Sequence, residues 1–96
     1  MAKRKPGLSI VKILLQNDRV RLAEMTIKPG DRGKLVERPD RVRYVFKGGK
    51  VREHFADGKV KNYLLKPGTV QWEDKSTSSM ENVGKSVVRF ITVQVF

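Results

Sequence analysis

The sequence predicts an all-β, single-domain antiparallel barrel. Apolar and polar residues alternate with a period of two over long stretches, which is typical of half-buried strands. Turn-forming Gly and Pro residues recur between these stretches at intervals of about ten to twenty residues, and no segment has a convincing helical period. A chain of 96 residues fits one domain with one modest core.

Six segments carry the strand pattern, and an apolar segment near the N-terminus can form another strand. The expected strands are 8–15, 20–27, 42–46, 51–55, 60–65, 70–72 and 87–96. Within 20–27, the pattern places Val20 and Leu22 on one face and Met25 and Ile27 on the other. This change of face predicts an irregularity at Ala23.

Glycine and proline pairs predict the turns between these strands. Residues 47–50 (Lys-Gly-Gly-Lys) and 56–59 (Ala-Asp-Gly-Lys) predict β-hairpins, because glycine supplies the positive φ that tight hairpin turns need. Residues 28–30 and 66–68, each Lys-Pro-Gly, predict turns that combine a fixed φ with a permissive one. Residues 82–85 (Asn-Val-Gly-Lys) predict a further turn.

The chain divides into a short tail and one domain. Residues 1–7 are basic and contain Pro6, so we expect a flexible N-terminus followed by a barrel domain over residues 8–96. No apolar run approaches the ~20 residues of a membrane-spanning helix. Cysteine is absent, which excludes a disulfide framework and a thiolate site. We therefore expect a cytoplasmic protein that does not engage a membrane.

The chain is strongly basic, with 21 Lys and Arg against 10 Asp and Glu and a net charge of +11. Such a charge is typical of proteins that bind nucleic acid, so a basic β-barrel associated with nucleic acid is one functional hypothesis. The charges are spread along the chain, and only residues 3–5 form a basic run. A solvated basic surface is therefore the simpler interpretation.

From Gly30 to Gly49 the chain keeps the spacing of a sequence motif that binds metal. The motif reads Gly, five residues, His, any residue, His, three or four residues, Glu, six residues, Gly. Here Val36 and Arg38 stand at the two histidine positions, and Val42 stands at the glutamate position when three residues intervene.

A second motif, which ends in His, three residues and Asn, is followed more loosely from Gly68 to Asn82, with Ser78 at the histidine position. Over residues 20–96 the sequence therefore resembles the cupins, small β-barrels that usually hold a metal inside the barrel. The resemblance implies a single cupin-like, jelly-roll antiparallel β-barrel in which the metal-ligand histidines are replaced.

The residues at the implied ligand positions argue against a metal cofactor. Transition metals in such sites prefer imidazole nitrogens and a carboxylate. Valine offers no lone pair, Arg38 would repel a dication, and Ser78 would ligate only weakly. His54 is the only histidine, and we expect it to be solvated or hydrogen-bonded on the strand 51–55. A metal-dependent cupin enzyme with atypical ligands remains an alternative hypothesis.

The same positions predict a cavity for another kind of ligand. Alternate residues of a strand share a face, so we expect one inward-facing set that allows for a bend at Pro39: Val36, Arg38, Val42, Tyr44 and Phe46. An arginine inside an apolar cavity needs a carboxylate or an anionic ligand. The alternative is that Arg38 reaches solvent, or pairs with Glu81 or Asp74. The candidate ligand-binding residues are Arg38, Tyr44, Trp72 and Ser78, although the aromatic side chains also suit a plain core.

These observations predict a non-enzymatic module that binds a small organic or anionic ligand. The sequence has no cysteine nucleophile, recognisable Ser–His frame or phosphate-binding loop. We also expect a homodimer, because the N-terminal strand supplies more apolar surface than a small barrel should leave exposed. The apolar residues concerned are Leu8, Ile10, Ile13, Leu14 and Leu15.

Overall fold

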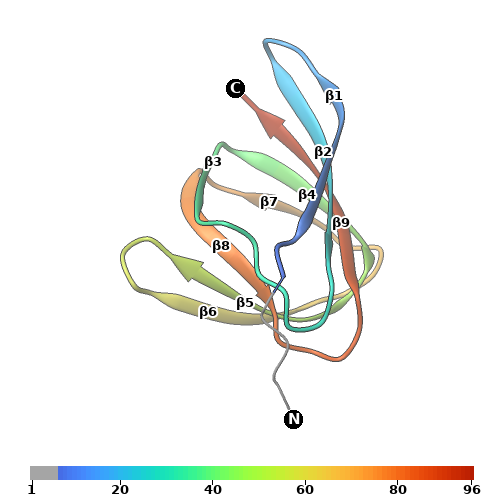
Figure 1. Cartoon of the computed structure of the whole chain (residues 1–96). Helices are drawn as coiled ribbons and strands as arrows, with labels where there is room; N and C mark the ends of the chain where they lie inside the picture. The colour runs from blue at the N-terminus through green and yellow to red at the C-terminus, as the bar shows by residue number, and fades with distance from the viewer. Residues whose placement is uncertain (1–6) are drawn as a thin grey trace.

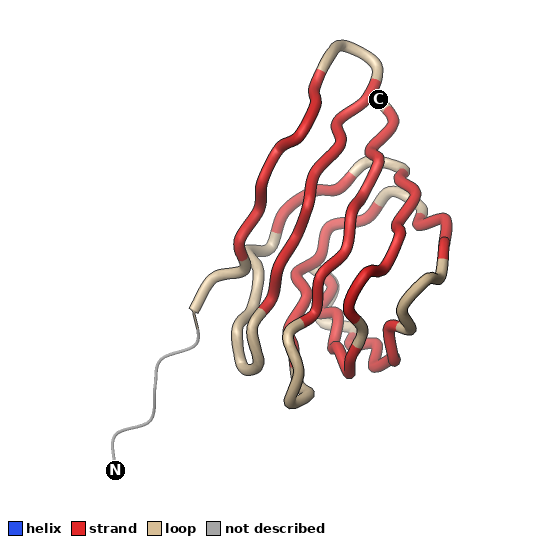
Figure 2. The backbone as a smooth tube through the Cα atoms, turned by 90° about the vertical axis from the view of Figure 1, so that its right-hand side faces the viewer, coloured by secondary structure: helices blue, strands red, loops and turns tan. Residues whose placement is uncertain are grey.

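A computed structural model describes residues 7–96, and the expectation of a flexible tail over residues 1–6 lies outside that range. The described chain contains nine strands. Its backbone trace shows strands and loops without a helix (Figure 2), and this confirms the all-β prediction. Within residues 7–96 there is accordingly no helix that could cross a membrane. Gly7, at the start of this range, is held by a hydrogen bond from its backbone N–H to Asp31 Oδ1.

The strands form two antiparallel sheets that face each other across the interior (Figure 1). The larger sheet has the order β1 (Ile10–Gln16), β2 (Val20–Ile27), β9 (Val88–Val95), β4 (Arg41–Lys47), β7 (Val70–Glu73). The smaller sheet has the order β3 (Val36–Arg38), β8 (Ser76–Asn82), β5 (Gly49–Phe55), β6 (Val60–Leu65). The β1–β2 hairpin projects beyond the body of the barrel, close to the C-terminus.

The hydrophobic core occupies one end of the interior. On the inner face of the larger sheet, Ile27 lies opposite Val88 and Met25 lies opposite Phe90, and all four are buried. Further along the same two strands, Ala23 pairs with Thr92 and Arg21 pairs with Gln94. The interior therefore changes from apolar to polar along the barrel, and the polar end is the one from which the β1–β2 hairpin projects.

The structure confirms the predicted faces of β2, with Val20 and Leu22 outside and Met25 and Ile27 inside, but it shows no irregularity at Ala23. Ala23, Met25 and Ile27 all point into the barrel, and β2 pairs with β9 without interruption. The irregularity lies instead in the neighbouring strand, where the register between β1 and β2 shifts between Ile13 and Leu15. This shift is a β-bulge in β1. The residue between Ile13 and Leu15 has no partner in β2, so the inward-facing positions of β1 change at that point.

Residues 47–50 do not form the predicted hairpin. β4 and β5 belong to different sheets, so this segment carries the chain from one sheet to the other. Neither glycine of the pair has a positive φ. Gly48 is needed for a close approach instead, because a Cβ there would collide with the Leu65 carbonyl oxygen and lie 2.8 Å from Pro67 Cδ.

The other predicted turns agree with the structure. The 56–59 segment joins β5 to β6, which pair as a hairpin, and Gly58 has a φ of 90°. The Lys-Pro-Gly turns also use positive φ, with 84° at Gly30 and 79° at Gly68. Asn82 closes the 82–86 turn by donating from Nδ2 to the carbonyl oxygens of Ile27 and Ser86, at 2.8 and 2.7 Å.

Two strands were not predicted. β3 has only three residues, and β8 (Ser-Thr-Ser-Ser-Met-Glu-Asn) lacks the β-branched and aromatic residues that mark strands. β8 forms because β3 and β5 pair with its two edges. Its strand conformation is therefore a consequence of tertiary pairing rather than of local propensity.

Candidate functional site

An open groove of about 460 Å³ lies between the edge strands of the two sheets, β1 and β3, and reaches the inner face of β2 and β9. This volume falls in the range of small-molecule sites. One wall and part of the floor are apolar, and the rest of the floor is cationic and polar. The lining of the groove includes Val11, Ile13, Arg21, Met25, Val36, Arg38 and Thr92.

The apolar wall of this groove comes from β1. Val11 pairs with Met25 and Ile13 pairs with Ala23, so these β1 side chains share the inward face of the larger sheet. Both nevertheless remain about half exposed. The smaller sheet has one strand fewer and ends at β3, and the open groove lies between β3 and the inner face of β1.

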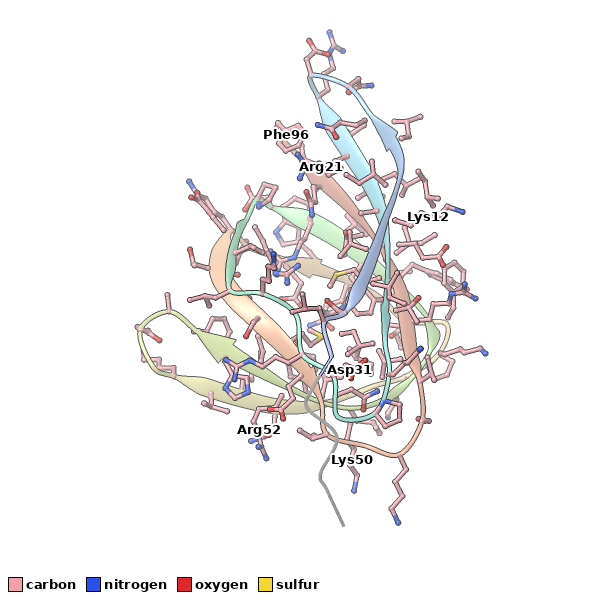
Figure 3. All side chains as sticks on the ribbon, in the orientation of Figure 1. Lys12, Arg21, Asp31, Lys50, Arg52 and Phe96 are labelled. Atoms are coloured by element: carbon pink, nitrogen blue, oxygen red, sulfur yellow. The ribbon has the colours of Figure 1, made fainter. Side chains whose placement is uncertain are left out.

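The polar floor comes from the ends of β2 and β9. Arg21 Nη1 donates to Gln94 Oε1 at 3.4 Å, and the Arg21 guanidinium lies 5.4 Å from the ring centre of Phe96. Figure 3 shows Arg21 and Phe96 together at this end of the barrel. Arg21 Nε and Thr92 Oγ1 are buried and make no hydrogen bond within residues 7–96. Thr92 is only 2% exposed, so its hydroxyl does not reach bulk solvent.

Arg38, from β3, borders the groove and is half-buried. Its one hydrogen-bond-type contact within residues 7–96 runs from Nη1 to Met25 Sδ at 3.7 Å, and it forms no ion pair with any carboxylate in that range. Burial lowers the pKa of this guanidinium, and the nearby charge of Arg41 lowers it further. Arg38 is therefore a cation that the described chain leaves without a contacting anion.

The expected partners of Arg38 are engaged elsewhere. Glu81 Oε1 lies 2.8 Å from His54 Nε2, and Asp74 Oδ1 accepts a hydrogen bond from Trp72 Nε1 at 2.9 Å. The prediction that Arg38 pairs with Glu81 or Asp74 is therefore wrong. The prediction that His54 is hydrogen-bonded on its strand is confirmed.

Two more arginines lie deeper in the barrel, on β4. Arg41 and Arg43 are 4% and 2% exposed. Arg43 Nη2 donates to Glu73 Oε1 at 2.7 Å, and its guanidinium lies over the rings of Tyr63 and Phe90. Arg41 donates to two backbone carbonyls, and burial lowers the pKa of its guanidinium.

Glu53, on β5, faces these arginines from the smaller sheet. Its carboxylate accepts hydrogen bonds from Ser78 Oγ at 2.6 Å and from Tyr63 Oη at 2.9 Å. Burial raises the pKa of the Tyr63 hydroxyl, and the carboxylate of Glu53 adds to that rise. Ser78 is thus inside the barrel as expected, but its hydroxyl is already bonded to Glu53.

The polar end of the interior carries an excess of positive charge. At this end of the described chain's interior, four guanidinium groups and two carboxylates face inward: Arg21, Arg38, Arg41, Arg43, Glu53 and Glu73. Glu37 also borders the groove, but it is exposed and pairs with Lys75 Nζ at 3.4 Å. An anion entering the groove would offset this excess.

The structure corrects the predicted inward set. Val36 and Arg38 line the groove, whereas Val42, Tyr44 and Phe46 lie on the outer face of the larger sheet. Tyr44 and Phe46 are exposed and meet edge to face on that surface. β3 and β4 belong to opposing sheets, and only two residues connect them. The inward side chains are therefore the even-numbered ones on β3, such as Arg38, and the odd-numbered ones on β4, such as Arg41 and Arg43.

Trp72 also lies outside the barrel. It pairs with Val42 across β7 and β4 and is 52% exposed. Tyr44, Trp72 and Ser78 do not line the groove, so of the four predicted ligand-binding residues only Arg38 borders it. The residues that sequence reasoning missed are Arg41, Arg43 and Glu53, which alternate with outward residues as strand period requires. The alternation of β4 is therefore visible in the sequence, but hydrophobicity favours its apolar residues as the inward ones.

The residues at the implied ligand positions do not fit a transition metal. Val42 points outward, and Arg43, which stands at the four-residue spacing that the motif also allows, points inward. The inward positions are then Val36, Arg38, Arg43 and Ser78, which supply two cations and no imidazole or carboxylate. Residues 7–96 hold no group of three His, Cys, Asp or Glu that could bind a metal ion.

Comparison with solved structures identifies the fold. A cupin domain protein from Bordetella pertussis Tohama I matches with a TM-score of 0.86 over 98% of this chain and 99% of that one, at 17% identity. A cupin family protein with a double-stranded β-helix fold from Methanocaldococcus jannaschii matches at 0.69, over 99% and 86%, with 18% identity. A predicted oxalate decarboxylase from Thermotoga maritima matches at 0.66, over 90% and 78%, with 22% identity.

The chain therefore has the cupin fold, as the sequence resemblance predicted. No family model matches the sequence, and no curated protein does. At these low identities the likeness establishes the architecture alone.

Proposed function

We propose that this protein is a non-enzymatic, metal-independent binding module for a small organic anion, which binds in the groove with its charged group at Arg38. The observation that carries the proposal is Arg38 itself, a half-buried guanidinium that borders the groove and contacts no carboxylate within residues 7–96. A buried charge is costly unless it is paired, so an anionic ligand would remove that cost.

Two features beside Arg38 support the same ligand chemistry. Thr92 Oγ1 is a buried hydroxyl on the groove floor with no hydrogen-bond partner in the described chain, and an anion at Arg38 would offer it an acceptor. The inward-facing groups around Arg38 have more guanidinium than carboxylate charge. Both features favour an acceptor-rich, negatively charged group over a neutral or cationic one.

The test is a panel of small carboxylates and inorganic phosphate, measured by calorimetry on the parent and on Arg38→Met. A charge-assisted pair contributes ~1.5–3 kcal/mol, so loss of Arg38 should weaken binding of a true ligand by roughly 10- to 100-fold. Arg19→Met is the matched control, because it removes the same charge from the exposed turn between β1 and β2.

Binding that disappears in Arg38→Met, persists in Arg19→Met and survives moderate salt supports the proposal. Equal weakening in both variants, with loss of binding at high salt, would show that the anions bind the general basic surface and would overturn it. Absence of any anion binding to the parent would overturn it as well.

Nucleic-acid binding is the weaker proposal. Arg21, Arg38, Arg41 and Arg43 line the groove or are buried, so they contribute little to an outer basic surface. The same variants separate the two functions. Salt-dependent binding of an RNA or DNA oligonucleotide that Arg38→Met leaves unchanged would favour the nucleic-acid function.

We further propose that the protein acts as a homodimer through the outer face of the larger sheet. One apolar row crosses all five strands of that face, as the strand registers show: Leu15, Leu22, Val93, Val42 and Trp72. Antiparallel sheets usually turn polar residues toward water, so a row of this kind indicates a covered surface. Val11 and Ile13 face the groove, so β1 contributes only part of its apolar surface to the interface.

Light scattering on the parent should give the mass of two chains at micromolar concentration. Val42→Lys places a charge at the centre of the apolar row and should give the mass of one chain. Val60→Lys, on the exposed surface of the smaller sheet, should leave the dimer intact. A single-chain mass for the parent would contradict the dimer.

We also propose that the protein is located in the cytoplasm, and cell fractionation tests this location.

A further inference from the structure

The groove has two chemically different parts, arranged along the barrel. The inner rows of the larger sheet run from Val11 beside Met25, through Ile13 beside Ala23, to Arg21 beside Gln94. The first rows are apolar and the last is cationic and polar. A ligand that fills the groove must therefore combine an apolar body with a polar or charged head.

We propose that the physiological ligand class is a monocarboxylate with an unbranched apolar chain, whose carboxylate binds at Arg38 and whose chain lies between β1 and β3. This inference rests on the proposed anion-binding function and adds the nature of the ligand's body. It assigns β1 a role as the wall of a binding site, in addition to its place at the edge of the sheet.

Exposure of the β1 side chains supports the apolar subsite. Val11 and Ile13 point into the groove from one side, and Val36 borders it from β3, yet all three remain 42–54% exposed. Inward-facing valine and isoleucine on a strand would normally be covered by the opposite sheet. A ligand chain lying between the two edge strands would remove this apolar surface from water.

The position of the charges supports a single head group. Arg38 and Thr92 border both this groove and the small inner cavity at Arg41 and Arg43, so the carboxylate site lies at the inner end of the groove. Lys34 also borders the groove, but it is exposed. Val11 pairs with Met25, two inward rows away from Arg21, the remaining cation of the groove. A chain directed from Arg38 toward Val11 would therefore place a second carboxylate against Val11 or in water, with little gain in either place.

Calorimetric titrations with butyrate, hexanoate and octanoate measure the contribution of the chain. Each buried methylene contributes about 0.8 kcal/mol when fully covered, so affinity should rise about two- to fourfold per methylene in this partly open groove. Octanol tests the head group, and suberate tests the cost of a second carboxylate on a chain of the same length.

Variants of exposed β1 residues test the location of the chain. Val11→Thr and Ile13→Thr should weaken octanoate binding about three- to tenfold and leave butyrate unchanged, since the first replaces a methyl group and the second an ethyl group by a hydroxyl. Ile10→Thr is the matched control, because Ile10 pairs with Thr26 and does not line the groove. Circular dichroism checks that all three variants fold.

The inference is supported if affinity rises with chain length, falls in Arg38→Met, Val11→Thr and Ile13→Thr, and is lower for octanol and suberate than for octanoate. Equal affinity for butyrate and octanoate, with both lost in Arg38→Met, would overturn this inference and leave the anion-binding function standing. Equal binding of octanol and octanoate would overturn both, because the groove would then be a plain apolar site. Suberate binding as tightly as octanoate would overturn the single-head assignment.

Discussion

Arg43 Nη2 lies 2.7 Å from Glu73 Oε1, between neighbouring strands β4 and β7, inside the barrel. The Arg43 side chain is almost fully buried, and that of Glu73 is 20% exposed. This pair neutralises one of the four inward arginines. Arg38 has no equivalent partner, and this difference separates a structural arginine from the candidate ligand-binding one.

Breaking the Arg43–Glu73 pair should destabilise the fold. Glu73→Gln removes the contacting carboxylate and leaves a buried guanidinium without its partner, so we expect the free energy of unfolding to fall by about 1–3 kcal/mol. The double variant Arg43→Met/Glu73→Gln removes both charges and should lose less than the sum of the single changes. Urea denaturation of all four proteins measures this coupling, and strictly additive losses would contradict it.

Stability should fall at alkaline pH because of Tyr63. Burial raises the pKa of this hydroxyl above its ordinary value of 10.0, so the unfolded chain releases the proton at a lower pH than the folded chain does. The stabilisation is complete below pH 10 and is lost as the pH rises from there toward the folded-state pKa. Tyr63→Phe should remove this part of the pH dependence, as measured by urea midpoints between pH 8 and about pH 11. An identical alkaline loss in Tyr63→Phe would refute the assignment.

Gly48 and Gly30 should respond differently to substitution. At Gly48 the limit is space, since a Cβ would meet Leu65 and Pro67, and Gly48→Ala should cost about 1–3 kcal/mol. At Gly30 the limit is a φ of 84° in open surroundings. Asparagine tolerates positive φ, so Gly30→Asn should be more stable than Gly30→Ala, whereas Gly48→Asn should be no better than Gly48→Ala. Thermal midpoints decide between these patterns.

Metal removal should leave the protein unchanged. The inward residues at the implied ligand positions carry two guanidinium groups, which would repel a dication. We expect incubation with EDTA to leave the thermal unfolding midpoint and octanoate binding within error, and elemental analysis to find far less than one transition metal per chain. About one metal per chain after mild purification would contradict the metal-independent function.

The sequence by itself determined the all-β class, most of the strands, the positive-φ turns at Gly30, Gly58 and Gly68, and the cupin-like spacing. These features are local: alternation of residue type and the backbone freedom of glycine act over a few neighbouring positions. It also marked Arg38 as the residue of interest, since Arg38 stands at a ligand position of the motif. The structure places Arg38 at the groove.

Only the tertiary structure decided which face of β4 is the inner one. The chain passes from β3 to β4 between opposing sheets, so the inward parity changes, and Arg41 and Arg43 are buried while Val42 and Tyr44 face outward. Local hydrophobicity favours the opposite assignment. Burial of the arginines is stable because Glu73, the rings of Tyr63 and Phe90 and the backbone carbonyl of Asp74, all far away in the sequence, contact them, and no local sequence pattern specifies those contacts.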